Sequence, residues 1–259
     1  MKKFITTAVV VLTTAVAGIL TWRKVESDRI RDDLWTEAER VSAEQDLAAQ
    51  KQALRRSLRA ARREAYGADP ERRSREADRL LAHAGPLLAL VDSVVARRRV
   101  ATGPAPRVAA FHPTPTEADV MPLAAELAAR GAELVFPAAA GTELEWIRWD
   151  GRSAFADSPG RGFGKEPVGE RLGADALAQA VLVLSPALAV DRAGTRIGHG
   201  AGYYDRALVT VPRSARVVAV VHPGELLAAG TLPREAHDVP IPEVLTADGI
   251  VSLITNDPA

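Results

Sequence analysis

The sequence predicts a three-layer α/β sandwich, in which a mainly parallel sheet carries helices on both faces and a hydrophobic helix precedes it. Two observations predict this fold. Short apolar runs such as 181–184 and 216–221 have the length of buried strands, and longer segments that fit helices separate such runs from about Lys51 to Ile254. Because a strand–helix–strand connection brings its two strands together in parallel, this alternation favours a parallel sheet between layers of helices.

The composition narrows the possible functions. The chain has 259 residues, with 33 basic and 33 acidic side chains and no cysteine. A net charge near zero gives no global argument for nucleic-acid binding, and we expect no nucleic-acid partner. Without cysteine the chain can have no disulfide, thiolate nucleophile or cysteine zinc site. The length suits one large domain with an appendage better than two full domains.

Residues 1–25 form a hydrophobic segment. Its uncharged run, residues 4–22, is long enough to cross a bilayer as a helix. A membrane anchor, a cleavable signal peptide cut near 15–17 and a buried soluble helix are the alternatives; the apolar run continues past residue 17, which favours the anchor. Basic residues after the run favour the cytoplasmic side for the rest of the chain, which would be soluble there without an anchor. Residues 26–50 are highly charged and predict a helical tether.

The elements after the tether follow from periodicity and breakers. Helices are predicted over residues 51–66, 71–84, 121–130 and 203–208, and strands over residues 107–111, 133–137, 144–150, 181–184, 216–221, 244–246 and 250–254. Residues 97–106 are polar and contain prolines, so we expect a loop there. In the strand 144–150 we assign Trp146 and Trp149 to the core rather than to a ligand.

The segment 196–206 carries the strongest functional signal. Three glycines recur at every second position, after an apolar run and before a segment that can begin a helix. Such glycines let the backbone present N–H groups to an anion, and a helix start adds unpaired amides. Arg196 adds positive charge, and Asp205 adds a carboxylate of the kind that holds Mg²⁺ beside phosphates. The glycines alone fit an ordinary tight turn equally well, so both interpretations stay open.

The complete string of residues 196–206, R-I-G-H-G-A-G-Y-Y-D-R, resembles the signature R-[LI]-G-x-G-x-G-Y-Y-D-R of the 5-formyltetrahydrofolate cyclo-ligases, also called methenyltetrahydrofolate synthetases. Further resemblances to that family follow in its order: K-x-x-L-R at residues 51–55, an acid after a proline-containing turn at Glu117, the turn around Phe163, and a His-Asp pair at 237–238. The resemblance covers residues 50–254 and implies an ATP- and folate-binding domain over residues 51–259. The first forty residues instead resemble a short single-span bacterial peptide that ends in D-L-W, so the join is either a true fusion or an over-extended gene start.

The resemblance implies ATP-dependent cyclisation of 5-formyltetrahydrofolate to 5,10-methenyltetrahydrofolate, with release of ADP and phosphate. It implies ATP and Mg²⁺ as cofactors, and we expect a monomer. Arg196 and Asp205 would be catalytic, and Asp205 and Asp238 would bind the metal. Glu117, Phe163 and Tyr204 would bind the substrate. The implied ATP-binding residues are Lys51, Arg55, Arg196, Gly198, His199, Gly200, Ala201, Gly202, Tyr203, Tyr204 and Asp205.

Two other functions fit parts of the sequence. The same architecture could serve a sugar-phosphate isomerase, with Glu117 as the base that transfers the proton. The chain could also be a membrane-tethered module that binds folate or nucleotide without catalysis. Three departures from the family pattern, at Ala201, at Pro242 and in a shortened turn at Phe163, are the reason to keep that second alternative.

Overall fold

The computed structural model describes residues 36, 39–67, 69–100, 104–141, 143–158 and 164–253, without the side chains of residues 99 and 100. The chain divides into two compact units, residues 1–50 and residues 51–259. In the first unit the described residues are helical and mostly exposed, and the predicted hydrophobic segment lies outside the described residues. Among the described residues, no single helix has the length and apolar composition of a membrane span; α2 (Pro70–His83) and α3 (Gly85–Val100) pass that test only together, bent by 50° at their junction.

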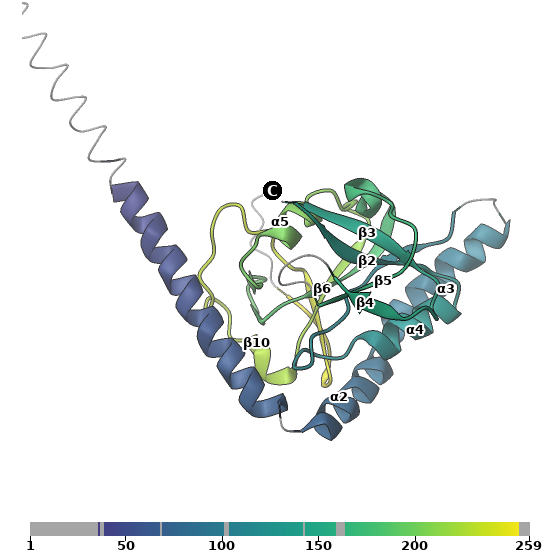
Figure 1. The fold of residues 1–259 in the computed structure, drawn as a ribbon, viewed down its shortest axis with the longest axis horizontal. Coiled ribbons are helices and arrows are strands. Elements are labelled where there is room, and N and C mark those ends of the chain that lie inside the picture. The colour runs from purple at the N-terminus through teal and green to yellow at the C-terminus, as the bar shows by residue number, and fades with distance from the viewer. Residues whose placement is uncertain are drawn as a thin grey trace, which may run out of the picture. The chain divides into compact units, whose positions relative to one another are not determined.

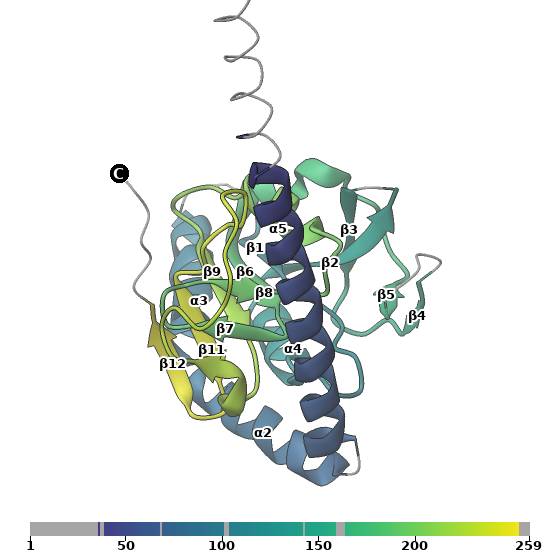
Figure 2. The same ribbon diagram turned by 90° about the vertical axis from the view of Figure 1, so that its left-hand side faces the viewer.

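The second unit is built on a seven-stranded sheet with the order β12-β11-β9-β6-β1-β2-β3 (Figure 2). The strands are β1 (Arg107–Ala109), β2 (Glu133–Ala140), β3 (Glu143–Trp149), β6 (Ala180–Pro186), β9 (Arg216–Val220), β11 (Glu243–Thr246) and β12 (Gly249–Ser252). Neighbouring strands from β11 to β2 pair in parallel, whereas the outer pairs β11–β12 and β2–β3 are antiparallel. The predicted mainly parallel sheet is therefore confirmed.

The two faces of this sheet have separate cores, because successive side chains of a strand point to opposite faces. Leu182 of β6 packs in a cluster with leucines of α2, α3 and α4 (Met121–Ala129). The next residue, Val183, packs on the other face with the 3₁₀ helix η1 (Ala174–Gln179) and α5 (Tyr203–Leu208). Figure 1 shows α2, α3 and α4 together on one side of the second unit. Trp146 and Trp149 are buried, as predicted.

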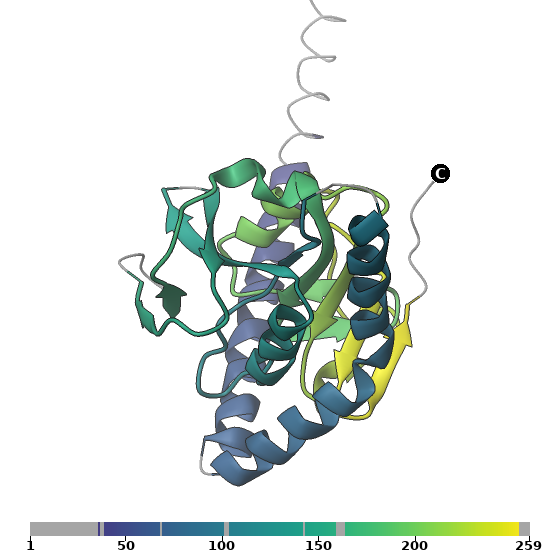
Figure 3. The same cartoon turned by 90° about the vertical axis from the view of Figure 1, so that its right-hand side faces the viewer.

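Helix α3 corrects the expectation of a loop over residues 97–106, since it continues to Val100. Gly85 and Pro86 look like breakers in the sequence, yet proline fits the first turn of a helix, where its missing N–H costs nothing. Leu87 and Val91 of this helix are fully buried. Figure 3 shows α2 and α3, in blue, meeting at an angle beside the yellow strands β11 and β12.

Two small sheets complete the unit. One has the order β10-β7-β8 and is formed by β7 (Ala189–Asp191), β8 (Arg196–Ile197) and β10 (Leu226–Leu227); the other pairs β4 (Phe155–Asp157) with β5 (Lys165–Pro167). The glycine segment, residues 196–206, was expected to follow the strand 181–184; β7 lies between the two, and β8 forms the first two residues of the segment. Residues 51–66 are helical, as predicted. Leu54 and Leu58 of this helix pack against a small apolar cluster that includes Ile197 of β8, which places the helix near the start of the glycine segment.

Candidate active site

Two arginines of the helix over residues 51–66 hold the glycine segment. Arg55 Nε donates to the carbonyl oxygen of Gly198 at 3.1 Å, and Arg59 Nη2 donates to that of His199 at 2.9 Å. The two arginines are four residues apart and therefore share one face of the helix. This face of the helix therefore lies against the glycine segment.

The backbone of the segment requires glycine at two positions. Gly200 has a φ of 105° and Gly202 a φ of 66°, in the region that residues with a side chain rarely adopt. Gly202 is also the N-cap of α5. No other type of residue in the described part of the chain has a positive φ, so Ala201 fits its position without this strain.

Arg196 and Asp205 form a largely buried ion pair at the two ends of the segment. Arg196 Nη2 lies 2.9 Å from Asp205 Oδ1, and Arg196 Nη1 donates to the Pro186 carbonyl at 3.3 Å. The guanidinium also lies 5.8 Å from the centre of the Tyr204 ring. Arg196 Nε and the Tyr204 hydroxyl are buried without a hydrogen-bond partner among the described residues. Unpaired buried donors are rare in proteins. They fit a site for a ligand that accepts hydrogen bonds, such as a phosphate.

Glu117 lies against the same segment. Its Oε1 is 2.9 Å from His199 Nε2 and 3.7 Å from Arg62 Nη1, and its Oε2 accepts from the Thr114 N–H at 2.7 Å. Burial alone raises the pKa of this carboxyl. The hydrogen bonds from His199 and Thr114, with the charges of His199 and Arg62, outweigh burial and hold the pKa below its usual value. Glu117 is therefore an ionised, buried acceptor beside the glycine segment.

Lys51 forms a second charged cluster. Its buried ammonium lies 2.6 Å from Glu235 Oε2 and 2.5 Å from Asp238 Oδ2. Glu235, His237 and Asp238 offer ligand atoms within 4.8 Å of one another. The two carboxylates are the oxygen donors that Mg²⁺ prefers. The donor set thus fits a divalent cation chemically, although the Lys51 ammonium pairs with both carboxylates in this arrangement.

Residues 47–247 match the model of the 5-formyltetrahydrofolate cyclo-ligase family. The chain belongs to this family. It is 40% identical over 153 residues to the 5-formyltetrahydrofolate cyclo-ligase of Mycolicibacterium smegmatis, an alignment that covers 56% of this chain and 76% of the relative.

Two solved structures of methenyltetrahydrofolate synthetases share the fold. The Aquifex aeolicus enzyme has a TM-score of 0.58 and 25% identity, and the match covers 81% of this chain and 95% of that one. The Mycoplasma pneumoniae enzyme has a TM-score of 0.52 and 18% identity, covering 76% and 98% of the two chains. The second likeness shows the fold alone.

The structure brings most of the predicted cyclo-ligase residues into connected groups. Arg55 and Glu117 both contact the glycine segment, which ends at the Arg196–Asp205 pair. Lys51 contacts Asp238. The predicted metal ligands Asp205 and Asp238 each pair with a different basic residue. Phe163 lies outside the described residues.

Other predicted residues have structural contacts of their own. The Tyr203 hydroxyl donates to the Gly141 carbonyl at 2.9 Å, and the Arg206 guanidinium lies 5.2 Å from the Tyr203 ring centre. Tyr204 meets Trp146 edge to face, with ring centres 6.3 Å apart. Burial raises the pKa of Tyr204, so its hydroxyl stays protonated and can donate.

Three residues that contact this site were not predicted from the sequence: Arg59, Arg62 and Glu235. Arg59 and Arg62 were visible as members of a basic helix, and their helical spacing from Arg55 was the signal that could have singled them out. Glu235 lies three residues before Asp238, but only the contact with Lys51 shows its place in the site.

Proposed function

We propose that this chain catalyses the ATP-dependent cyclisation of 5-formyltetrahydrofolate to 5,10-methenyltetrahydrofolate, with ADP and phosphate as the other products. Family membership supports the reaction. One observation carries its location: the helix over residues 51–66 holds the glycine segment so that His199 touches Glu117. The glycine segment, which would bind the nucleotide, and Glu117, which would bind the folate, are thereby in contact.

The reaction needs the formyl oxygen to become a good leaving group. Transfer of the γ-phosphoryl group of ATP to this oxygen gives an imino-phosphate and ADP. N10 of the folate then attacks the formyl carbon, the carbon–oxygen bond breaks and phosphate leaves. Phosphoryl transfer depends mainly on alignment and on neutralisation of charge.

The residues of the site fit these needs. The glycine segment would bind the phosphates through its backbone, with Arg55 and Arg196 supplying positive charge and the two tyrosines closing the pocket. Lys51 would join them on the nucleotide. Glu117, ionised and buried, would accept hydrogen bonds from N–H groups of the pterin, and Phe163 would lie against its ring.

We assign magnesium to the carboxylates of this site. Asp238 with Glu235 offers neighbouring oxygen ligands, and Asp205 offers another beside the glycine segment. The ion would supply charge neutralisation for the nucleotide phosphates.

The N-terminal region adds a proposal about location. Residues 1–25 would anchor the chain in the membrane, and residues 26–50 would hold residues 51–259 away from the lipid on the cytoplasmic side, where ATP and reduced folates are found. The chain would act as a monomer.

A spectrophotometric assay tests the proposed reaction. The full chain in detergent, given 5-formyltetrahydrofolate, ATP and Mg²⁺, should produce the absorption band of the methenyl product, and omission of ATP or metal should abolish it. Product without ATP would overturn the proposal. Binding of folate and ATP with no product would favour the non-catalytic module, and turnover of sugar phosphates without ATP would favour the isomerase.

A further inference from the structure

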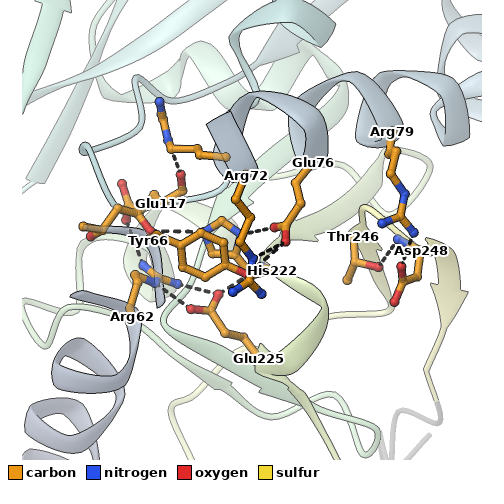
Figure 4. A network of polar contacts seen from close by, with 12 residues as sticks. Arg62, Tyr66, Arg72, Glu76, Arg79, Glu117, His222, Glu225, Thr246 and Asp248 are labelled. Carbon is orange, nitrogen blue, oxygen red and sulfur yellow. Dashed lines mark hydrogen bonds and ion pairs between the residues drawn. The ribbon is translucent and has the colours of Figure 1, made fainter. Parts of the chain in front are cut away.

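A buried polar network lies behind the turn that carries Glu117 (Figure 4). It joins the helix over residues 51–66 to α2 and to the 3₁₀ helix η2 (Pro223–Glu225). His222 is at its centre, and the side chain of this histidine is 1% exposed. His222 has no role in the proposed chemistry, so its burial calls for another explanation.

His222 connects Glu76 to the backbone of the turn. Its Nδ1 lies 2.7 Å from Glu76 Oε2, and its Nε2 lies 3.1 Å from the carbonyl oxygen of Thr116, the residue before Glu117. The imidazole ring stacks on Tyr66 at 3.5 Å, with 13° between the ring planes. The contacts of both ring nitrogens and the stacking on Tyr66 therefore fix the orientation of the imidazole ring.

The two hydrogen bonds of His222 need two protons. A carbonyl oxygen only accepts, so Nε2 must carry a proton for Thr116. A second proton must lie between Nδ1 and the Glu76 carboxylate, because two acceptors 2.7 Å apart would repel each other. The pair thus holds one proton more than a neutral histidine beside a carboxylate.

The other groups around the pair place that proton on the histidine. Glu76 Oε1 accepts from Arg72 Nε at 3.1 Å and from the Tyr66 hydroxyl at 3.2 Å. Burial, followed by the charge of Glu76, raises the pKa of Tyr66, so its hydroxyl remains a donor. The backbone N–H of His222 donates to Glu225 Oε2 at 3.0 Å. Surrounded by donors, Glu76 is best satisfied as a carboxylate and His222 as an imidazolium.

Arg62 and Arg73 complete the charged groups that face this turn. Arg62 donates to both oxygens of Glu225, at 2.6 and 2.7 Å, and its Nη1 lies 3.7 Å from Glu117 Oε1. Arg73 Nε donates to the Glu117 carbonyl oxygen at 2.8 Å. The turn is thus held from behind at two successive carbonyls, by His222 and by Arg73.

We propose that His222 and Glu76 are positioning residues, which hold the Thr116–Glu117 turn in place through a shared proton. The proposal rests on the function proposed above, in which Glu117 binds the folate. When the proton is lost, the neutral His222 has one N–H left and can no longer donate to both Glu76 and the Thr116 carbonyl, so the turn is held less firmly. The KM for 5-formyltetrahydrofolate then rises with pH, while kcat changes less, because neither residue touches the reacting atoms.

The variant Glu76→Gln tests whether a pH dependence of KM comes from the His222–Glu76 pair or from another ionisable group. A glutamine amide can donate to Nδ1 of a neutral histidine whose Nε2 still donates to Thr116, so no extra proton is needed. His199 also contacts Glu117, from the glycine segment, and Glu76→Gln leaves this contact unchanged. Glu71→Gln, an exposed change on the same helix, is the matched control.

Steady-state kinetics of the full chain from about pH 6 to about pH 9 gives the first reading. In the wild type and in Glu71→Gln, the KM for folate should rise about tenfold over this range, the equivalent of one hydrogen bond to a charged group. In Glu76→Gln the KM should be nearly independent of pH. His222→Gln, which cannot hold both partners, should have a raised KM at every pH, whereas the exposed His83→Gln should match the wild type.

Nuclear magnetic resonance of the ¹⁵N-labelled histidines gives a second reading that does not depend on activity. Both ring nitrogens of His222 should carry hydrogen in the wild type at the lower pH, and one in Glu76→Gln. A singly protonated His222 in the wild type throughout would overturn the shared proton. Equal KM profiles in the wild type and Glu76→Gln would overturn the positioning role. No turnover in the wild type would defeat the proposed function and this role, while the resonances would still report the proton.

Discussion

At the residue scale, the Arg196–Asp205 pair is the most direct test of the site. Asp205→Asn keeps the shape of the side chain and removes its charge, so we expect turnover to fall on the order of a hundredfold with the fold intact. Arg196→Ala should be as inactive, and it should also lower the free energy of unfolding by about 2 kcal/mol, because it leaves Asp205 without its buried partner. Steady-state kinetics and thermal melting measure both effects.

The exposed Arg192→Ala is the control for this pair, since it removes an arginine of the same region that the site does not use. It should keep normal activity. Near-normal turnover in both Asp205→Asn and Arg196→Ala would mean that the segment is only a turn and that other residues carry the chemistry.

Glu117 should make the folded state sensitive to acid. Its pKa is lowered in the folded chain, where the contacts with His199, Thr114 and Arg62 outweigh burial. A group of this kind stabilises the fold above the pKa of the unfolded chain, and its contribution is lost as pH falls through the lower, folded pKa. Denaturation followed from neutral pH to about pH 3 should show a smaller loss of stability in Glu117→Gln than in the wild type. The exposed Glu64→Gln should follow the wild type, and equal acid slopes in all three proteins would contradict the expectation.

The sequence allowed prediction of site residues that belong to short motifs, but not of residues whose role depends on contacts with distant parts of the chain. Arg196, Asp205 and Glu117 lie in short strings whose spacing carries meaning. His222 gains its place from Glu76, 146 residues away, and Arg62 from Glu225, 163 residues away. Nothing near His222 in the chain marks it, and only its helical spacing from Arg55 marks Arg62, because the contacts exist only once the sheet has brought the segments together.

At the element scale, the glycine segment allows a comparison of adjacent positions. Gly200→Ala would place a side chain at a φ of 105°, with its Cβ 3.3 Å from the Arg55 guanidinium. We expect the KM for ATP to rise on the order of tenfold or more, since backbone strain of this kind costs about 1–3 kcal/mol. Ala201→Gly is the matched control and should change the KM for ATP little, because Ala201 has no positive φ to relieve. Equal effects of the two changes would show that the segment does not depend on its present backbone.

Long elements with a clear period were predictable, whereas short elements were not. The helix over residues 51–66 and the strand β6 agree with the pattern. β7 and β8 have three and two residues, too few for any periodicity, and their pairing depends on tertiary contacts. Helix α3 was missed because Gly85 and Pro86 signal a break and also suit a helix start.

At the scale of the whole molecule, we expect the catalytically active unit to include Lys51. The second unit starts at this residue, and the match to the family starts at residue 47. Lys51 is 3% exposed and contacts Glu235 and Asp238, so it needs the preceding helical turn to stay in place. A chain of residues 47–259 should fold and retain the activity of the full chain. A chain of residues 52–259 should fold but lose most of its turnover, as measured by the methenyl absorption; equal activity of the two would remove Lys51 from the site.

Under the proposal of a membrane anchor, the N-terminal segment would decide where this activity takes place. Lys2 and Lys3 precede the run at residues 4–22, whereas four basic residues follow it closely: Arg23, Lys24, Arg29 and Arg31. Basic residues favour the cytoplasmic side and acidic neighbours count little, so the folate domain should lie inside, although the amino terminus narrows the difference. Cells that express the full chain should yield it in the membrane fraction, and protease added to intact spheroplasts should leave the domain uncut. Recovery in the soluble fraction would remove the anchor, digestion from outside would reverse the orientation, and the chain of residues 47–259 should be soluble in the same fractionation.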